Sequence, residues 1–315
     1  MTGKYYSCQI KRQIENGNWN CVSVVLSWEG IKSDLTCQRS PRDKIESKKT
    51  SIKCLSSDYD GTISPLNVSR LESRVPLETR VMLGQIGRFL PISIITMKDL
   101  SFIMPRTPFA YAWSAIGGLE MRIGKRVLKR EDLEHKLRSI SIALDYAKSQ
   151  ITISGAEIEE KQDSEGQTVA FCVDWRRVSN PMEAKRRAER VAAFCRAARL
   201  RVIRSEGQPF YDVYPVAPDK GRALQEMLEE LALNNAGILY LGDSEMDNSA
   251  FKASTVSVGV QHDETVLDKL DCEYFVEFKR VPEFLNALMA NNFLFTPDLP
   301  MIKINPRRCK VIENH

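Results

Sequence analysis

The chain has 315 residues, of which 43% are hydrophobic and 27% are charged, a composition typical of soluble globular proteins that bury a substantial core. The net charge of +4 comes from the first 50 residues, which hold nine basic and five acidic side chains, so no nucleic-acid-binding surface is expected elsewhere. No apolar run reaches the ~18 residues of a membrane span, and no hydrophobic signal segment opens the chain. We therefore expect a cytoplasmic protein without a membrane partner.

The cysteines and histidines exclude several kinds of site. The eight cysteines are scattered and form no C-x-x-C pair, which favours free thiols over disulfides or a zinc site. Only three histidines occur, at His135, His262 and His315, so a histidine-built metal site or a Ser-His-Asp triad is disfavoured. No chemical role is expected for His262 or for Cys172.

The first 50 residues contain one strand-like run, 21–26, to which the sequence assigns no function. From residue 51 a regular order of elements is expected: a strand at 52–57, a helix at 76–89, a strand at 91–96, a helix at 131–149, a strand at 167–175, helices at 181–199 and 221–233, and strands at 237–241 and 255–260.

This order predicts the fold class. The continuous β-branched character of 91–96 is typical of a strand that is buried on both faces of a parallel sheet, and alternation with helices indicates a doubly wound, mostly parallel, Rossmann-like α/β core. The strand at 167–175 has a polar face, which suits an inserted α+β module. We therefore expect five parts: an N-terminal extension (1–50), the first part of the core (51–120), an inserted cap (121–214), the second part of the core (215–292) and a C-terminal tail (293–315).

Polar motifs stand where ligands bind in such a sheet, beyond the carboxyl ends of the strands. They are Asp58-Tyr59-Asp60-Gly61-Thr62, Thr96, Asp219-Lys220-Gly221 and Gly242-Asp243-Ser244-Glu245-Met246-Asp247. Two aspartates one residue apart repel each other unless a cation or a shared proton neutralises them.

The motifs fit phosphoryl transfer. Asp58 could attack phosphorus, and Asp60 could protonate the leaving alcohol and then activate water. Thr96 could donate a hydrogen bond to a phosphoryl oxygen, and Lys220 would supply positive charge to it. Oxygen ligands for Mg²⁺ would come from the four aspartates Asp58, Asp60, Asp243 and Asp247, the last of which could instead hold Lys220.

In this order the motifs resemble those of the haloacid dehalogenase superfamily of phosphatases, over roughly residues 51–292. The resemblance implies a Mg²⁺-dependent phosphomonoester hydrolase that forms an aspartyl-phosphate on Asp58. It also implies that the insertion is the larger α+β cap of the sugar-phosphatase branch.

Within that branch the sequence looks most like the trehalose-6-phosphate phosphatases. Residues 58–65 look like their D-Y-D-G-T-L-(T/S)-P signature, 158–161 are similar to V-E-x-K, and 211–215 resemble V-E-V-x-P. The likeness implies that trehalose 6-phosphate is the first candidate substrate and that the cap residues that contact its hydroxyls are Glu159, Lys161 and Asp212.

Two departures keep alternatives open. Thr96-Met97-Lys98-Asp99 stands where the family has S-G-R, and residues 242–248 read closer to the G-D-S-E-N-D of other cap-bearing sugar phosphatases. Mannosyl-3-phosphoglycerate and sucrose phosphate remain alternative substrates, and a non-catalytic sugar-phosphate sensor, which would not need Asp60, is the alternative class. Whether Trp175 and Arg176 stack on sugar or pack stays open. A sugar phosphate is the one partner expected, and the protein is expected to be a monomer.

Overall fold

The structure is a computed structural model that describes residues 49–66, 68–204, 208–233, 237–262 and 269–305, together with three strands nearer the N-terminus. The chain divides into two compact units, residues 1–48 and 49–315. Within the described residues, no helix combines the length and the apolar character that crossing a membrane requires.

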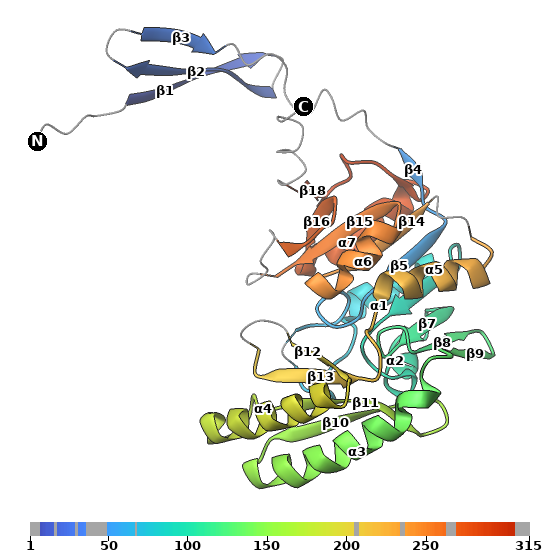
Figure 1. Cartoon of the computed structure of the whole chain (residues 1–315). Coiled ribbons are helices and arrows are strands. Elements are labelled where there is room, and N and C mark those ends of the chain that lie inside the picture. The colour runs from blue at the N-terminus through green and yellow to red at the C-terminus, as the bar shows by residue number, and fades with distance from the viewer. Residues whose placement is uncertain are drawn as a thin grey trace, which may run out of the picture. The chain divides into compact units, whose positions relative to one another are not determined.

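The N-terminal unit contains a three-stranded antiparallel sheet in the order β1-β2-β3 (Figure 1). Its strands are β1 (Ser7–Glu15), β2 (Asn18–Trp28) and β3 (Ile31–Leu35). The strand-like run predicted at 21–26 lies within β2.

The second unit is built on a nine-stranded sheet in the order β18-β16-β15-β14-β5-β6-β7-β8-β9. In chain order its strands are β5 (Cys54–Ser57), β6 (Ile92–Ile95), β7 (Ala112–Ala115), β8 (Glu120–Ile123), β9 (Arg126–Lys129), β14 (Ile238–Gly242), β15 (Val256–Gln261), β16 (Tyr274–Glu277) and β18 (Lys303–Ile304). The six strands from β16 to β7 are parallel to one another, whereas β8, β9 and β18 join in antiparallel pairs.

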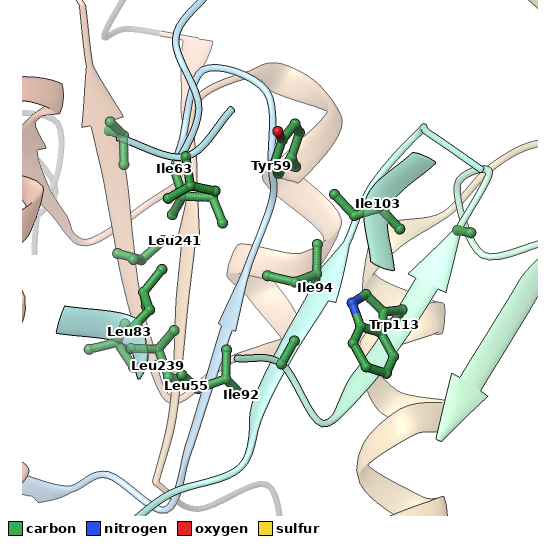
Figure 2. Close-up of a cluster of buried hydrophobic side chains, with 14 of the residues drawn as sticks. Leu55, Tyr59, Ile63, Leu83, Ile92, Ile94, Ile103, Trp113, Leu239 and Leu241 are labelled. Carbon is green, nitrogen blue, oxygen red and sulfur yellow. The ribbon is translucent and has the colours of Figure 1, made fainter. Parts of the chain in front are cut away.

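Helices cover both faces of this sheet, which confirms the predicted doubly wound, mostly parallel core. The helices are α1 (Leu77–Ile86), α2 (Leu100–Ile103), α5 (Lys220–Glu230), α6 (Asn248–Ala253) and α7 (Val281–Ala290), with short 3₁₀ helices at Met104–Arg106, Glu245–Asp247 and Phe278–Arg280. Alternate strand residues face opposite ways: Leu239 and Leu241 pack with α1 and α7, and Ile238 and Tyr240 pack with α5 and α6. Figure 2 shows part of the hydrophobic cluster that contains Leu239 and Leu241, to which Tyr59 also belongs.

A separate four-stranded antiparallel sheet, which we call the cap sheet, has the order β10-β11-β13-β12 (Figure 1). Its strands are β10 (Glu157–Gln162), β11 (Thr168–Asp174), β12 (Arg201–Ile203) and β13 (Phe210–Tyr214). Two amphipathic helices, α3 (Glu134–Ile151) and α4 (Pro181–Ala197), pack on one face of it, and a 3₁₀ helix at Thr152–Ser154 follows α3. Asn180 caps α4 by accepting a hydrogen bond from the amide of Glu183, and Pro181 occupies its first turn.

The pairing of strands differs from the expected ranges at two places. Residues 121–129 fall inside the range expected for the cap, but β8 and β9 extend the core sheet because β8 pairs with β7. Part of the expected C-terminal tail also pairs with the core unit: β17 (Leu294–Phe295) pairs with β4 (Thr50–Ser51), and β18 pairs with β16. Four cysteines in the described ranges are buried and form no disulfide bond with one another: Cys54, Cys172, Cys195 and Cys272.

Candidate active site

Three of the predicted site residues lie at the carboxyl ends of adjacent parallel strands. Asp58 directly follows β5, Thr96 follows β6, and Asp243 follows β14. Because β5 pairs in parallel with both β6 and β14, these three residues meet at one edge of the sheet.

Lys220 reaches this edge from the start of α5. Asp219 caps the helix by accepting hydrogen bonds from two backbone amides of its first turn. Gly221 lets the helix start approach α6 closely, because a Cβ there would lie 2.5 Å from the carbonyl oxygen of Ser249. The Lys220 ammonium is buried and lies 2.8 Å from Oδ2 of Asp58.

Asp247 holds Lys220 from the other side. Its Oδ1 accepts hydrogen bonds from Lys220 Nζ and from the hydroxyl of Tyr240, each at 2.7 Å. Its Oδ2 accepts hydrogen bonds from the backbone amides of Asp243 and Ser244, each at 3.1 Å. Since both carboxylate oxygens are used in this way, the geometry favours holding Lys220 over binding a metal, the second of the two roles that the sequence offered for Asp247.

The carboxylates of this edge form an acidic group in which the oxygens of Asp58, Asp243 and Asp247 lie within 4.8 Å of one another. Burial raises the pKa of Asp58 to about 7 although Lys220 opposes the increase. Burial, with Asp247 and Asp58 close by, also raises the pKa of Asp243 well above its usual range. Crowded, buried carboxylate oxygens that bind protons this strongly are a donor set that fits a hard divalent cation such as Mg²⁺.

Asp60, the fourth predicted metal ligand, is not a member of this three-carboxylate group. Its side chain is 39% exposed, and its Oδ2 lies 3.8 Å from Nζ of Lys98. Its Oδ1 accepts a hydrogen bond from the hydroxyl of Ser73 at 3.5 Å. An accessible carboxyl group two residues from Asp58 suits proton transfer better than it suits binding within a buried cluster.

The turn after Asp60 requires glycine. Gly61 has a φ of +74°, and a Cβ there would lie 2.1 Å from Oδ2 of Asp243. The carbonyl oxygen of Gly61 accepts a hydrogen bond from Nε2 of His262 at 2.5 Å, and the His262 ring stacks on Phe278. His262, for which the sequence suggested no role, thus contacts the turn that carries Asp60.

Thr96 is buried, and its Oγ1 accepts a hydrogen bond from the backbone amide of Lys98 at 3.2 Å. A hydroxyl that accepts one hydrogen bond retains its own proton, which it can donate to a phosphoryl oxygen.

The three predicted cap residues share the face of the cap sheet that α3 and α4 leave uncovered. Glu159 pairs with Cys172 and Cys172 pairs with Asp212 across neighbouring strands, so these side chains point the same way, as does Lys161 two positions along β10. Tyr214, two residues after Asp212, belongs to the hydrophobic cluster of the core. This face therefore lies against the core.

Lys161 and Asp212 form a buried ion pair. Nζ of Lys161 lies 2.6 Å from Oδ1 of Asp212 and donates a second hydrogen bond to the hydroxyl of Tyr214 at 2.9 Å. Burial would lower the pKa of Lys161, but Asp212, Tyr214, Cys172 and Glu159 together outweigh it, and the pKa is raised well above its usual value. The pair keeps a polar, charged surface between the cap sheet and the core.

Glu159 binds two cations of the core. Its Oε1 forms an ion pair with Nη1 of Arg70 and lies 3.7 Å from Nζ of Lys98. Burial would raise the pKa of Glu159, but Lys98, Lys161 and Arg70 together lower it below its usual value. Glu159 is thus an ionised group that joins the cap sheet to the core.

Trp175 and Arg176, which follow β11, have different surroundings. Trp175 is buried in the hydrophobic cluster beneath the cap helices, with its ring edge-on to Tyr211. Arg176 forms an ion pair with Asp174 at 2.5 Å and lies over the ring of Phe210. These surroundings favour packing for Trp175, whereas the side chain of Arg176 is 43% exposed.

Three residues near the site were not assigned by sequence reasoning: Arg70, Lys98 and His262. Lys98 lies in the stretch 96–99 that departs from the family pattern, and this departure was a usable signal. Arg70 and His262 lie in segments without any motif, and their partners are distant in the chain, so no local pattern marks them.

Comparisons of sequence find sugar phosphatases. The family profile described as Sucrose-6F-phosphate phosphohydrolase matches residues 158–274. A probable trehalose-phosphate phosphatase D from Arabidopsis thaliana is 26% identical over 215 residues, which cover 62% of this chain and 55% of that protein. The chain therefore spans about half the length of this curated relative.

Comparisons of structure find the same fold. A trehalose-6-phosphate phosphatase related protein aligns with a TM-score of 0.61 at 16% identity, covering 76% of this chain and 97% of that one. The C-terminal domain of C. albicans trehalose-6-phosphate phosphatase gives 0.59 at 19% identity, covering 76% and 93%. A haloacid dehalogenase-like hydrolase from Bacteroides thetaiotaomicron gives 0.57 at 15% identity, covering 75% and 98%. The chain thus has the haloacid dehalogenase fold that its motifs predicted, and the trehalose-6-phosphate phosphatases are among the proteins that it resembles.

Proposed function

We propose that this protein is a divalent-metal-dependent phosphatase of sugar phosphates that works through an aspartyl-phosphate on Asp58. The observation that carries the proposal is the buried contact of Lys220 with Asp58 and Asp247, beside the carboxylate of Asp243. A nucleophilic carboxylate, a fixed ammonium and a second carboxylate at one strand edge are the groups that phosphoryl transfer requires.

The reaction that we propose uses these groups in two steps. An oxygen of Asp58 bonds to phosphorus as the bond between phosphorus and the sugar oxygen breaks, and Asp60 gives its proton to that oxygen. A water oxygen then bonds to phosphorus, the Asp58 oxygen leaves with its electron pair, and Asp60 takes the proton of the water. Lys220 and the hydroxyl of Thr96 stabilise the phosphoryl oxygens in both steps.

Asp58 and Asp243 would hold the divalent cation, for which we propose Mg²⁺ because all the donors are hard oxygens. When bound, the cation supplies positive charge to the phosphoryl oxygens and keeps the carboxylates ionised. Asp247 serves by fixing Lys220.

Trehalose 6-phosphate is the first candidate substrate. Support comes from the sequence likeness to trehalose-phosphate phosphatases and from the charged cap face that carries Lys161 and Asp212, since the hydroxyls of a buried sugar need polar partners. The match of residues 158–274 to a sucrose-phosphatase profile keeps sucrose phosphate in the comparison, together with mannosyl-3-phosphoglycerate.

The test is phosphate release from these three compounds and from glucose 6-phosphate, with Mg²⁺ and with EDTA. We expect Mg²⁺-dependent release, with trehalose 6-phosphate highest in kcat/KM, and at least about a thousandfold loss in Asp58→Asn, whose amide cannot form the acyl phosphate. Wild-type rates in Asp58→Asn would overturn the mechanism. Binding of a sugar phosphate without release of phosphate from any compound would instead identify a sensor.

A further inference from the structure

Arg70 is fixed within the core by two contacts. Its Nη2 lies 2.5 Å from Oδ2 of Asp99, and its guanidinium lies over the ring of Phe102, 4.4 Å from the centroid. Asp99 is itself immobilised, because its Oδ1 caps α2 by accepting a hydrogen bond from the backbone amide of Phe102 at 2.8 Å. Two contacts within the core therefore hold the guanidinium.

The other end of the same guanidinium binds the cap. Nη1 of Arg70 forms an ion pair with Glu159 on β10, and the same carboxylate oxygen lies 3.7 Å from Nζ of Lys98. Lys98 in turn lies 3.8 Å from Oδ2 of Asp60. These contacts form a continuous series of charge pairs that runs from the start of α2 through the cap sheet to the proposed proton donor. We call this series the core–cap network; its members, in order of contact, are Asp99, Arg70, Glu159, Lys98 and Asp60.

A second contact joins the cap sheet to the core at the β10–β11 turn. Oε1 of buried Glu120, on β8, accepts hydrogen bonds from the amide and the hydroxyl of Ser164, at 2.9 and 2.6 Å. Lys129, at the end of β9, lies 2.9 Å from Oδ2 of Asp163. This turn contact, formed by Glu120, Lys129, Asp163 and Ser164, adjoins residue 130, where the chain leaves the core sheet for the cap.

The turn contact and the pair between Arg70 and Glu159 lie at different distances from the end of β10. Glu159 lies four positions from Asp163, or about 13 Å along the strand at ~3.3 Å per residue. A contact at the turn holds one end of β10 but leaves rotation about that end possible. The pair between Arg70 and Glu159 lies away from the turn and therefore opposes this rotation. It thus controls how close the face with Lys161 and Asp212 comes to Asp60.

From this geometry we infer that Arg70 is a positioning residue that fixes the cap sheet over the site by binding Glu159, and that Glu159 serves this contact instead of reading sugar hydroxyls. The inference rests on the proposed phosphatase function for its kinetic consequence. Asp99 and Lys98, two of the residues that depart from the family pattern, are the ones that hold Arg70 and share Glu159 with it.

A double-mutant cycle tests this assignment with Arg70→Ala, Glu159→Ala and the double variant, on the best sugar phosphate and on p-nitrophenyl phosphate. Each single variant should lower kcat/KM for the sugar phosphate by about three- to tenfold, the range of a partly exposed charge-assisted contact. The double variant should be no worse than either single variant, because both remove the same contact. Turnover of p-nitrophenyl phosphate, which offers no sugar to the cap, should change less than twofold.

The controls separate this contact from general effects of charge. Arg74→Ala removes an exposed arginine of the same loop and should behave as wild type. Arg70→Lys should lie between wild type and Arg70→Ala, since an ammonium keeps the charge but cannot fork to two carboxylates. Multiplying effects in the double variant would overturn the inference and show that Glu159 contacts the sugar independently of Arg70. Equal behaviour of Arg70→Ala and Arg74→Ala would overturn it as well.

Hydrogen exchange supplies a readout that does not need turnover. In the full chain without substrate, backbone amides of residues 157–162 should exchange faster in Arg70→Ala than in wild type, and those of β14 should not change. Unchanged exchange on β10 would reject the positioning role. If the wild-type protein released phosphate from no sugar phosphate, the proposed function would fail, and the exchange result would still decide whether Arg70 holds the cap.

Discussion

Lys220 and Asp247 form an ion pair in which Nζ and Oδ1 are 2.7 Å apart and neither side chain is more than 2% exposed. Oδ2 of Asp247 also accepts hydrogen bonds from two backbone amides, so the orientation of the carboxylate is fixed as well as its distance from Lys220. The free energy of burying these charges is recovered only while every partner is present.

Asp247→Asn should therefore damage both stability and turnover. The amide cannot accept hydrogen bonds on its nitrogen, and it leaves Lys220 with Asp58 alone; breaking a buried pair costs about 3–5 kcal/mol. We expect the free energy of unfolding in urea to fall by about that amount and kcat to fall by at least about a hundredfold.

Asp271→Asn is the matched control, because Asp271 forms a surface pair with Lys252 at 2.8 Å in which both side chains are at least 36% exposed. Its loss should cost less than about 1 kcal/mol. Equal destabilisation by the two changes would contradict the buried role of Asp247.

Metal binding should depend on pH. The metal-free fold holds the pKa of Asp58 at about 7 and raises that of Asp243, so protons compete with the cation in neutral and acidic solution. The apparent affinity for Mg²⁺ should rise as pH increases from 5 through 7 and then level off above the raised pKa values. Calorimetric titration in two buffers of different ionisation enthalpy measures the protons released.

The stability of the metal-free protein should decrease as pH rises, whereas its affinity for Mg²⁺ increases. The pKa of Asp58 is higher in the folded chain than in the unfolded chain, so this group stabilises the fold fully at pH values below its pKa in the unfolded chain. That contribution disappears as pH rises through about 7. Asp58→Asn should thus flatten the decline in Tm between pH 4 and pH 7 and should release fewer protons on binding Mg²⁺. Proton release that matches wild type would exclude Asp58 as a ligand.

The buried pair of Lys161 and Asp212 should affect both substrate recognition and stability. Lys161→Met keeps much of the volume but leaves Asp212 and the Tyr214 hydroxyl without the ammonium, so we expect a loss of about 1–3 kcal/mol in the free energy of unfolding. KM for the sugar phosphate should rise, whereas p-nitrophenyl phosphate should be affected less. Equal losses on both substrates would mean that the pair supports the fold without facing the sugar.

His262 should affect kcat through its hydrogen bond to the carbonyl oxygen of Gly61. His262→Leu removes the donor, and because one hydrogen bond contributes about 1 kcal/mol, kcat should fall by roughly fivefold with KM little changed. His262→Gln places an amide N–H near the same carbonyl and should recover part of kcat. A His262→Gln enzyme as slow as His262→Leu would argue for a packing role on Phe278.

The sequence by itself determined the fold class and which polar residues gather at one edge of the sheet. Asp58, Thr96 and Asp243 each follow an apolar strand, and parallel strands in one sheet bring their carboxyl ends to one edge, so proximity follows from local patterns and from one rule of topology. Lys220 was within reach of the same reasoning, because an Asp-Lys-Gly run that opens a helix predicts where that helix begins.

Only the tertiary structure decided the roles that depend on distant partners. Asp247 could bind a metal or hold Lys220, and the hydrogen bonds that occupy both of its oxygens favour the second role. The hairpin of β8 and β9 carries no signal that separates core from cap, because membership depends on pairing with β7. Arg70 and Glu159 are 89 residues apart, and Gly61 and His262 are 201 apart. Such contacts depend on placement to within an ångström by the packing of the whole domain, which leaves no periodicity in the sequence.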